Sequence, residues 1–188
     1  MAGKERGQGA ATMSGEKTFD WTQQSTRKRN AGLKIPTAED FLAYDGHHCH
    51  ALYKSLPPEW QCPGCGRSPF QILRWTDRYR NKPTMRHFGW VVGLHRHHDH
   101  AGDAGGFFGN SPYARFPQTV LCEQCNTTDG TVKRTLQLPK EFSYSPEEIR
   151  AFVEPIPHGW HIVNYQRAAQ IYESVRRCPP PVIPGAHM

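Results

Sequence analysis

The sequence predicts a small α+β protein whose zinc-stabilised core, a β-hairpin followed by a helix, is flanked by helices on its N- and C-terminal sides. Two Cys-x-x-Cys pairs, Cys62/Cys65 and Cys122/Cys125, bracket the middle of the chain, and four thiols in two pairs are a standard way to hold one tetrahedral zinc ion. Between the pairs, imidazoles and a carboxylate crowd into residues 95–100. Hydrophobic residues make up only 37% of the chain, so a bound metal would offset a small apolar core.

The chain of 188 residues has the length of one domain with an extension at each end. Its first segment is polar and basic, a composition typical of a disordered tail. The predicted division is a disordered basic tail at 1–35, an N-terminal helical flank at 36–60, the zinc-bound core at 61–137, C-terminal helices at 138–178 and a tail at 179–188.

The charge of the chain and the spacing of its cysteines limit the classes of partner and the cellular compartment that we expect. The formal net charge is +6, and a basic central segment suits a polyanionic partner, although solubility alone would also account for it. Four of the six cysteines occur in two Cys-x-x-Cys sequences, which indicates metal binding in a reducing compartment. Cys49 and Cys178 are then left as free thiols. The sequence has no apolar run of about 18 residues and no apolar N-terminal segment, so we expect a cytoplasmic protein without a membrane partner.

The region up to the first Cys pair predicts a short helix and then a zinc knuckle. Thr37 can cap a helix over residues 38–44, with Asp40 as its capping-box partner. Thiolates this close in sequence can face one ion only if the backbone turns tightly, and Gly64 and Gly66 permit that turn. A single pair of this kind could be a redox pair, but the second pair favours zinc.

Residues 70–88 carry cations interleaved with aromatic rings, a mixture that suits a nucleic-acid surface. The same segment fits an amphipathic helix with Ile72, Leu73, Trp75 and Tyr79 facing inward and the arginines facing out. Both readings can hold together. The cations expected to contact DNA, here and in the rest of the core, are Arg74, Arg78, Arg80, Lys82, Arg86, Arg96, Arg115, Lys133 and Arg134.

The second half of the core predicts two strands and a helix. Residues 87–95 are rich in aromatic and β-branched side chains, which indicates a strand that delivers the histidines to its end. The Gly-rich loop over residues 101–118 is longer than usual connections, so we expect it to be functional. Residues 120–121 fit the second strand of a hairpin, and residues 122–136 fit a helix with Asn126 near its start.

The C-terminal part predicts two packed helices. The Ser-Pro-Glu-Glu sequence at residues 145–148 is a capping box with proline at the first helical position, and it opens a helix that runs through Val153. Asn164 can cap a second helix over residues 165–177. The apolar face of that helix consists of Ala168, Ile171, Tyr172 and Val175.

The chemistry that fits the histidine cluster is phosphodiester hydrolysis. That reaction needs a base to activate water and a divalent ion held so that the scissile phosphate completes its coordination shell. A neutral imidazole at a strand end can be the base, and an amide oxygen from a facing helix can help to hold the ion. Four thiolates around zinc leave no open position, so the zinc would be structural.

The order of these motifs resembles a known family. The pattern consists of His95-x-His97-His98-Asp99-His100, a Gly-rich spacer, and Leu121-Cys122-x-x-Cys125-Asn126-x-x-Asp129-Gly130. It is similar to the His-Asn-His (HNH, ββα-metal) endonuclease superfamily, and within it to the phage recombination endonuclease VII group. The likeness covers about residues 60–135 and is fairly specific, because both Cys pairs and both active-site segments occur in order.

The resemblance implies a role for each matching residue. His98 would be the general base, and His97 and Asn126 would hold a catalytic Mg²⁺ or Mn²⁺ ion. The four residues implied to bind the structural Zn²⁺ are Cys62, Cys65, Cys122 and Cys125. The residues implied to assist around the phosphate and the ion are His95, His100 and Asp129.

Two departures from the family pattern leave the register open. His97 stands where the group has an aspartate ligand, and imidazole favours softer ions such as manganese, nickel or zinc over magnesium. The spacer is also longer than in the group, and it lacks the sequence that usually precedes the second Cys pair there. Asp99 and His100, two residues along the same strand, therefore remain an alternative ligand and base, although we favour His97 and His98.

The function expected from the sequence is a metal-dependent DNA endonuclease, acting as a homodimer on double-stranded or branched DNA. A small restriction endonuclease is our first choice, and a Holliday-junction-type resolvase or a nicking endonuclease is the alternative. A non-catalytic zinc-stabilised DNA-binding module is the alternative from another class. A metal-handling protein would require residues 47–50, His-His-Cys-His, to join the site.

Overall fold

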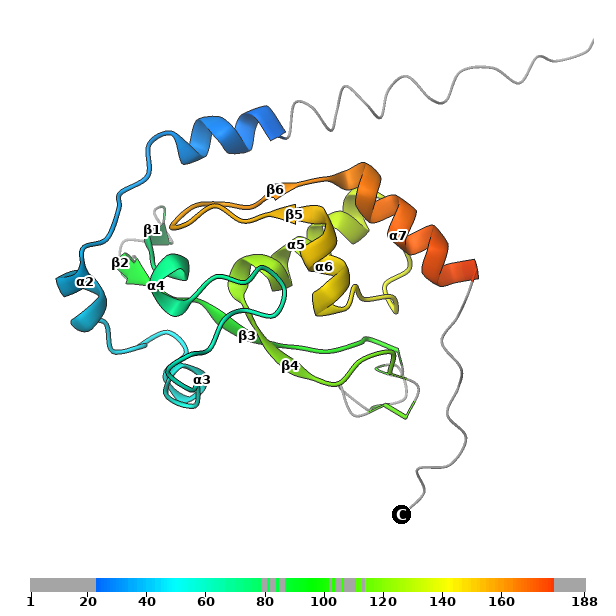
Figure 1. Ribbon diagram of the computed structural model, residues 1–188, viewed down its shortest axis with the longest axis horizontal. Coiled ribbons are helices and arrows are strands. Elements are labelled where there is room, and N and C mark those ends of the chain that lie inside the picture. Colours follow the sequence, from blue (N-terminus) through cyan, green and yellow to red (C-terminus); the bar gives the residue numbers. More distant parts are fainter. Residues whose placement is uncertain are drawn as a thin grey trace, which may run out of the picture.

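The computed structural model describes residues 23–78, 81, 84, 87–101, 103, 106, 111–112 and 114–177, except the side chains of Arg78 and His87. These residues form three two-stranded antiparallel sheets and several helices, so the predicted mixed α+β class is confirmed (Figure 1). The elements in chain order are α2 Ala38–Leu42, α3 His50–Lys54, α4 Pro69–Ile72, β1 Arg74–Arg78, β2 His87–Val91, β3 Leu94–His97, β4 Thr119–Cys122, α5 Glu123–Thr135, α6 Pro146–Phe152, β5 Val153–Glu154, β6 Ile162–Val163 and α7 Tyr165–Arg177.

The centre of the molecule is the hairpin of β3 and β4, followed at once by α5 (Figure 1). The strands pair antiparallel, with Leu94 opposite Cys122. The amide of Glu123, the first residue of α5, donates to the Gly93 carbonyl at 2.8 Å and joins the helix start to the base of the hairpin. The predicted second strand and the predicted helix after it are confirmed.

The apolar core lies against this hairpin and helix. Leu121 in β4 and Val132 in α5 are fully buried, together with Leu73 and Ile149. Three cysteines of the two pairs are fully buried in the same cluster, and Cys65 is 7% exposed. The thiols are therefore part of the core, and a metal ion bound to them would stabilise it directly.

The segment after the first Cys pair forms a β-hairpin. The helix α4 is a single turn, and β1 then pairs with β2, with Trp75 opposite Trp90 and their rings edge-to-face at 5.3 Å. The expected amphipathic helix is wrong here, because cross-strand aromatic packing outweighs the helical spacing. The predicted strand over 87–95 is two strands, because β2 pairs with β1 and β3 pairs with β4, with Val92 and Gly93 between them.

Residues 23–30 form a helix, whereas the sequence predicted a disordered tail through residue 35. The helix lies near the β5–β6 hairpin (Figure 1). Asn30 Nδ2 donates to the Trp160 carbonyl at 2.8 Å, and Asn30 Oδ1 accepts from the Trp160 amide at 2.8 Å. These tertiary hydrogen bonds order a segment whose composition alone predicts disorder. The predictions for residues 1–22 and 179–188 fall outside the described residues.

The C-terminal helices pack as the sequence predicts. Ser145 Oγ accepts from the Glu148 amide at 3.2 Å and Glu148 Oε2 accepts from the Ser145 amide at 2.7 Å, so this capping box is confirmed, as is the one at Thr37. The buried Tyr144 hydroxyl donates to the Ala168 carbonyl of α7 at 3.0 Å. Among the described helices, none has both the length and the apolar character needed to cross a bilayer.

Candidate active site and zinc centre

The two Cys pairs meet in one buried cluster, as the sequence predicts. The Sγ atoms of Cys62 and Cys125 lie 3.8 Å apart, as do those of Cys65 and Cys122, and all four lie within 4.8 Å of one another. Sulfur ligands at 2.3 Å from a tetrahedral zinc ion lie about 3.8 Å apart. The cluster can therefore hold a structural zinc ion with no position left for a substrate.

The tight turn of the first pair brings its thiols to face the second pair. The amides of Cys65 and Gly66 both donate to the Cys62 carbonyl, at 3.1 and 2.7 Å, and Gly66 has a φ of +74°. The Cys122 amide donates to Cys62 Sγ at 3.3 Å. Glycine is needed at Gly64, where a Cβ would lie 3.1 Å from Cys125 Sγ.

The thiols influence one another's ionisation. A hydrogen bond from Cys122 lowers the pKa of Cys65, and one from Cys125 lowers the pKa of Cys122. The Cys122 sulfur raises the pKa of Cys62 and of Cys125. The four thiols therefore do not all ionise unless a cation compensates their charge, and a divalent ion supplies that charge.

Arg67 and His161 support this cluster, and the sequence analysis missed both. The Arg67 side chain is 3% exposed and donates from Nε to Cys65 Sγ at 3.4 Å and from Nη2 to Cys122 Sγ at 3.5 Å. Burial lowers the pKa of Arg67, but the charge of the Cys122 and Cys65 thiolates raises it, and the net shift is upward. His161 Nε2 lies 3.3 Å from Cys125 Sγ. The one sequence signal was an arginine two residues after the first Cys pair.

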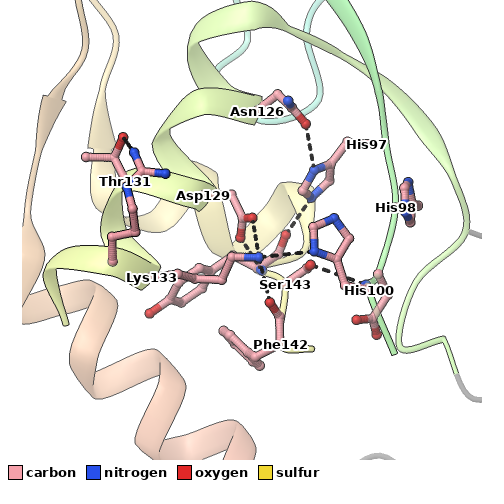
Figure 2. Close-up of polar contacts among 12 residues, drawn as sticks. His97, His98, His100, Asn126, Asp129, Thr131, Lys133, Phe142 and Ser143 are labelled. Carbon is pink, nitrogen blue, oxygen red and sulfur yellow. Dashed lines mark hydrogen bonds and ion pairs between the residues drawn. The ribbon is translucent and has the colours of Figure 1, made fainter. Parts of the chain in front are cut away.

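A second site lies at the other end of the β3–β4 hairpin, where His97 ends β3 and Asn126 lies in the first turn of α5 (Figure 2). His97 is 3% exposed, and its ring stacks on Phe116 at 5.3 Å. Its Nε2 lies 2.8 Å from the carbonyl oxygen of Tyr144, which can only accept, so Nε2 carries the proton.

Because the proton of the neutral His97 ring is on Nε2, the nitrogen that faces Asn126 is the unprotonated Nδ1. In the neutral ring Nδ1 then has a lone pair, and it lies 3.2 Å from Oδ1 of Asn126, which is also an acceptor in this orientation of the amide (Figure 2). Two acceptors at this distance do not stabilise each other. A cation between them would, and imidazole nitrogen with amide oxygen is a suitable donor pair for a divalent ion.

Asp129 holds this arrangement together. Its Oδ1 accepts from the Tyr144 amide at 2.9 Å, and its Oδ2 pairs with Lys133 Nζ at 2.9 Å. Lys133 also donates to the Phe142 carbonyl at 2.8 Å and is 8% exposed. The two side chains are buried against each other, and the Asp129 metal ligand and the Lys133 DNA contact stay predictions. Through the Tyr144 backbone, Asp129 positions His97.

Asp99 organises the loop after β3. It is 1% exposed, and its two carboxylate oxygens accept from the amides of Ala101 at 3.2 Å and Arg115 at 2.8 Å. Both oxygens therefore accept backbone hydrogen bonds, and Asp99 as the metal ligand stays the alternative prediction. Arg115 donates to the Ser143 carbonyl at 2.8 Å and pairs with Glu148. These contacts anchor Arg115 within the chain, and its DNA contact stays a prediction.

The remaining histidines of the cluster separate into two groups. His98 and His100 lie side by side with ring centroids 4.9 Å apart, and His98 Nε2 is 3.3 Å from Asp103 Oδ2. His100 Nδ1 accepts from Lys133 Nζ at 3.4 Å. His95 is exposed earlier on β3. The structure thus brings together the predicted base His98 and His100, one of the two histidines predicted to assist it.

The predicted DNA-contacting cations also differ in exposure and in their partners. Arg74 donates to Glu123 Oε2 at 3.0 Å and lies 4.3 Å above the Trp160 ring, so it has structural partners, and its DNA contact stays a prediction. Arg96 and Arg134 are exposed. The predictions that fall outside the described residues are Arg80, Lys82, Arg86 and the side chain of Arg78.

Comparison of the chain with protein-family models, with characterised proteins and with solved structures finds no match. The function is therefore inferred from the chemistry of the two sites. One site can hold zinc through four thiols. The other presents two converging acceptors beside a pair of accessible imidazoles.

Proposed function

We propose that the protein is a metal-dependent DNA endonuclease of the HNH (ββα-metal) type, with a structural Zn²⁺ at the four cysteines. The hairpin β3–β4 followed by α5 supports this proposal, because it presents strand-end histidines to an asparagine in the first turn of a helix. The closed thiol cluster supports it as well, since it ties the start of α5 to the preceding knuckle.

The observation that carries the proposal is the 3.2 Å approach of His97 Nδ1 to Asn126 Oδ1, with the His97 proton fixed on Nε2. In an octahedral site whose ligand atoms lie about 2.1 Å from the ion, two neighbouring ligand atoms lie about 3.0 Å apart. The donor set therefore fits a divalent ion such as Mg²⁺ or Mn²⁺, and imidazole tilts the preference toward manganese. When bound, that ion supplies charge stabilisation for the scissile phosphate and the leaving oxygen.

His98 is the proposed general base. Its Nε2 faces the Asp103 carboxylate at 3.3 Å, so the proton lies on Nε2 and the Nδ1 lone pair is free to take a proton from water. The side chain is 23% exposed, which leaves it accessible to substrate. The exposed Arg96 and Arg134 are the proposed phosphate contacts.

We propose double-stranded or branched DNA as the substrate and a homodimer as the active form, because two chains with one site each can cut both strands of a duplex together. A small restriction endonuclease is the first candidate. A Holliday-junction-type resolvase and a nicking endonuclease share the same chemistry. A zinc-stabilised DNA-binding module without catalysis would leave the converging acceptors without a purpose.

Cleavage of supercoiled plasmid and of a four-way junction in Mg²⁺ or Mn²⁺ tests the proposal. We expect the wild type to cut DNA, and so should the control His50→Ala, which changes an exposed histidine of α3. The variant His98→Ala should keep its fold and lose cleavage. Discrete plasmid fragments indicate a restriction enzyme, and junction-selective cutting indicates a resolvase. DNA binding without any cutting would overturn the proposal in favour of the non-catalytic module.

A further inference from the structure

His98, His100 and Asp103 form a second group of potential metal ligands, separate from the thiols. Each residue offers one ligand atom, and the three atoms lie within 4.8 Å of one another. All three side chains are partly exposed, so an ion can reach them from solvent. Two imidazoles and a carboxylate are ligands that borderline ions such as Zn²⁺ prefer over Mg²⁺.

The shortest contact in this group has the spacing of a coordinated pair. His98 Nε2 and Asp103 Oδ2 lie 3.3 Å apart, and nitrogen and oxygen ligands at 2.0 Å from a tetrahedral zinc ion lie about 3.3 Å apart. The other carboxylate oxygen, Asp103 Oδ1, is buried and has no hydrogen-bond partner among the described residues.

We propose that His98, His100 and Asp103 form a second, weaker Zn²⁺ site, and that its occupation inhibits cleavage. The binding of zinc here needs only these three side chains. The inhibition rests on the proposed nuclease function, because an ion on Nε2 of His98 leaves the ring proton on Nδ1 and removes the lone pair that would take a proton from water.

Lys133 makes this site weaker than the thiol cluster. Its ammonium lies 3.4 Å from His100 Nδ1 and repels an incoming cation, although the ion pair with Asp129 reduces that repulsion. His100 must also rotate to bring its ligand atom onto the ion, since the three atoms span up to 4.8 Å. The site therefore fills reversibly at zinc concentrations above those that saturate the four thiols.

Metal titration tests the binding directly. Protein whose thiol cluster already holds zinc is titrated with Co²⁺ or Zn²⁺, as wild type, Asp103→Asn, His100→Gln and the control His50→Ala. In addition to the ion at the proposed His97–Asn126 site, we expect the wild type and the control to bind one ion at this site, with weak visible Co²⁺ bands and no new thiolate absorption. Each ligand variant should bind that ion at least about tenfold more weakly, because even outer-shell partners contribute that much.

Equal affinity in the wild type, Asp103→Asn and His100→Gln would overturn the site. Asp103→Glu keeps a carboxylate and should retain more binding than Asp103→Asn, which separates ligation from a folding defect. In the cleavage assay, excess Zn²⁺ should inhibit the wild type more than His100→Gln. Binding of the second ion by a protein that never cuts DNA would refute the nuclease proposal and the inhibition, and leave the metal site standing.

Discussion

The thiol cluster and the His97–Asn126 pair use the same hairpin and helix for opposite purposes. Cys122 lies opposite Leu94 at one end of the β3–β4 hairpin, and His97 lies at the other end. Consecutive residues of α5, Cys125 and Asn126, point about 100° apart and so serve different sites. Four protein ligands would close one site, whereas the proposed catalytic ion would have only two at the other. The comparison suggests a testable rule, that the number of protein ligands separates a structural ion from the proposed reactive one.

Removal of zinc should have the largest effect. Structural zinc contributes about 10–16 kcal/mol in small domains, which is comparable to or larger than the total stability of about 5–15 kcal/mol of most proteins. We therefore expect Cys125→Ser, or treatment with a strong chelator, to unfold the core, as measured by circular dichroism during heating. Cys49→Ser is the control, since Cys49 lies outside the cluster. A chelated protein with an unchanged melting temperature would refute the structural role.

Loss of the base should leave the fold intact and abolish chemistry. His98→Ala removes a partly exposed side chain, so the melting temperature should change little. Cleavage should fall about 10²- to 10⁴-fold, the usual contribution of a general base. Single-turnover cleavage of a labelled duplex measures this effect. A loss restricted to His100→Ala would move the base to that residue.

Disruption of the buried pair beneath the site should cost both stability and metal affinity. Asp129→Asn leaves the Lys133 ammonium buried without its carboxylate, which should destabilise the fold by about 3–5 kcal/mol in urea unfolding. It also loosens the Tyr144 carbonyl that orients His97. The double variant Asp129→Asn/Lys133→Met should recover part of the stability. No recovery would show that the pair is not coupled as described.

The smallest of these effects should come from Arg67. Arg67→Gln removes two hydrogen bonds to thiolate sulfurs, so zinc affinity should fall about 10- to 100-fold in competition with a chelating dye. Arg150→Gln, a change in an exposed arginine of α6, is the matched control. Unchanged affinity would mean that Arg67 acts through its other partners, which include the loop carbonyls of Ile156 and Gly159 and the Gln124 side chain.

Local signals predicted the parts of the fold that local chemistry determines. The capping boxes at Thr37 and Ser145 and the hairpin before α5 follow from neighbouring residues, and the structure contains each of them. The β1–β2 hairpin was missed because Trp75 and its neighbours fit a helical spacing equally well. The helix over 23–30 was missed because its partner, Trp160, is far away in sequence.

For the site too, the sequence predicted which residues come together but not which side chains surround them. Sequence order identified the four thiols, and also His97 and Asn126, which the structure brings together. It could not show that Lys133, Arg115 and Arg74 are turned inward, because a cation's role depends on which carboxylate folds beside it. Nor could it reveal His161 beside the thiols, since that contact joins two distant segments.

The most direct measurement of the central claim is plasmid cleavage as a function of Mn²⁺ concentration for the wild type and Asn126→Ala. If Asn126 Oδ1 and His97 Nδ1 share the catalytic ion, the variant should need at least about tenfold more Mn²⁺ to reach half of its maximal rate. His50→Ala should match the wild type. Identical Mn²⁺ dependence in the wild type and Asn126→Ala would contradict the assignment of this pair as the catalytic metal site.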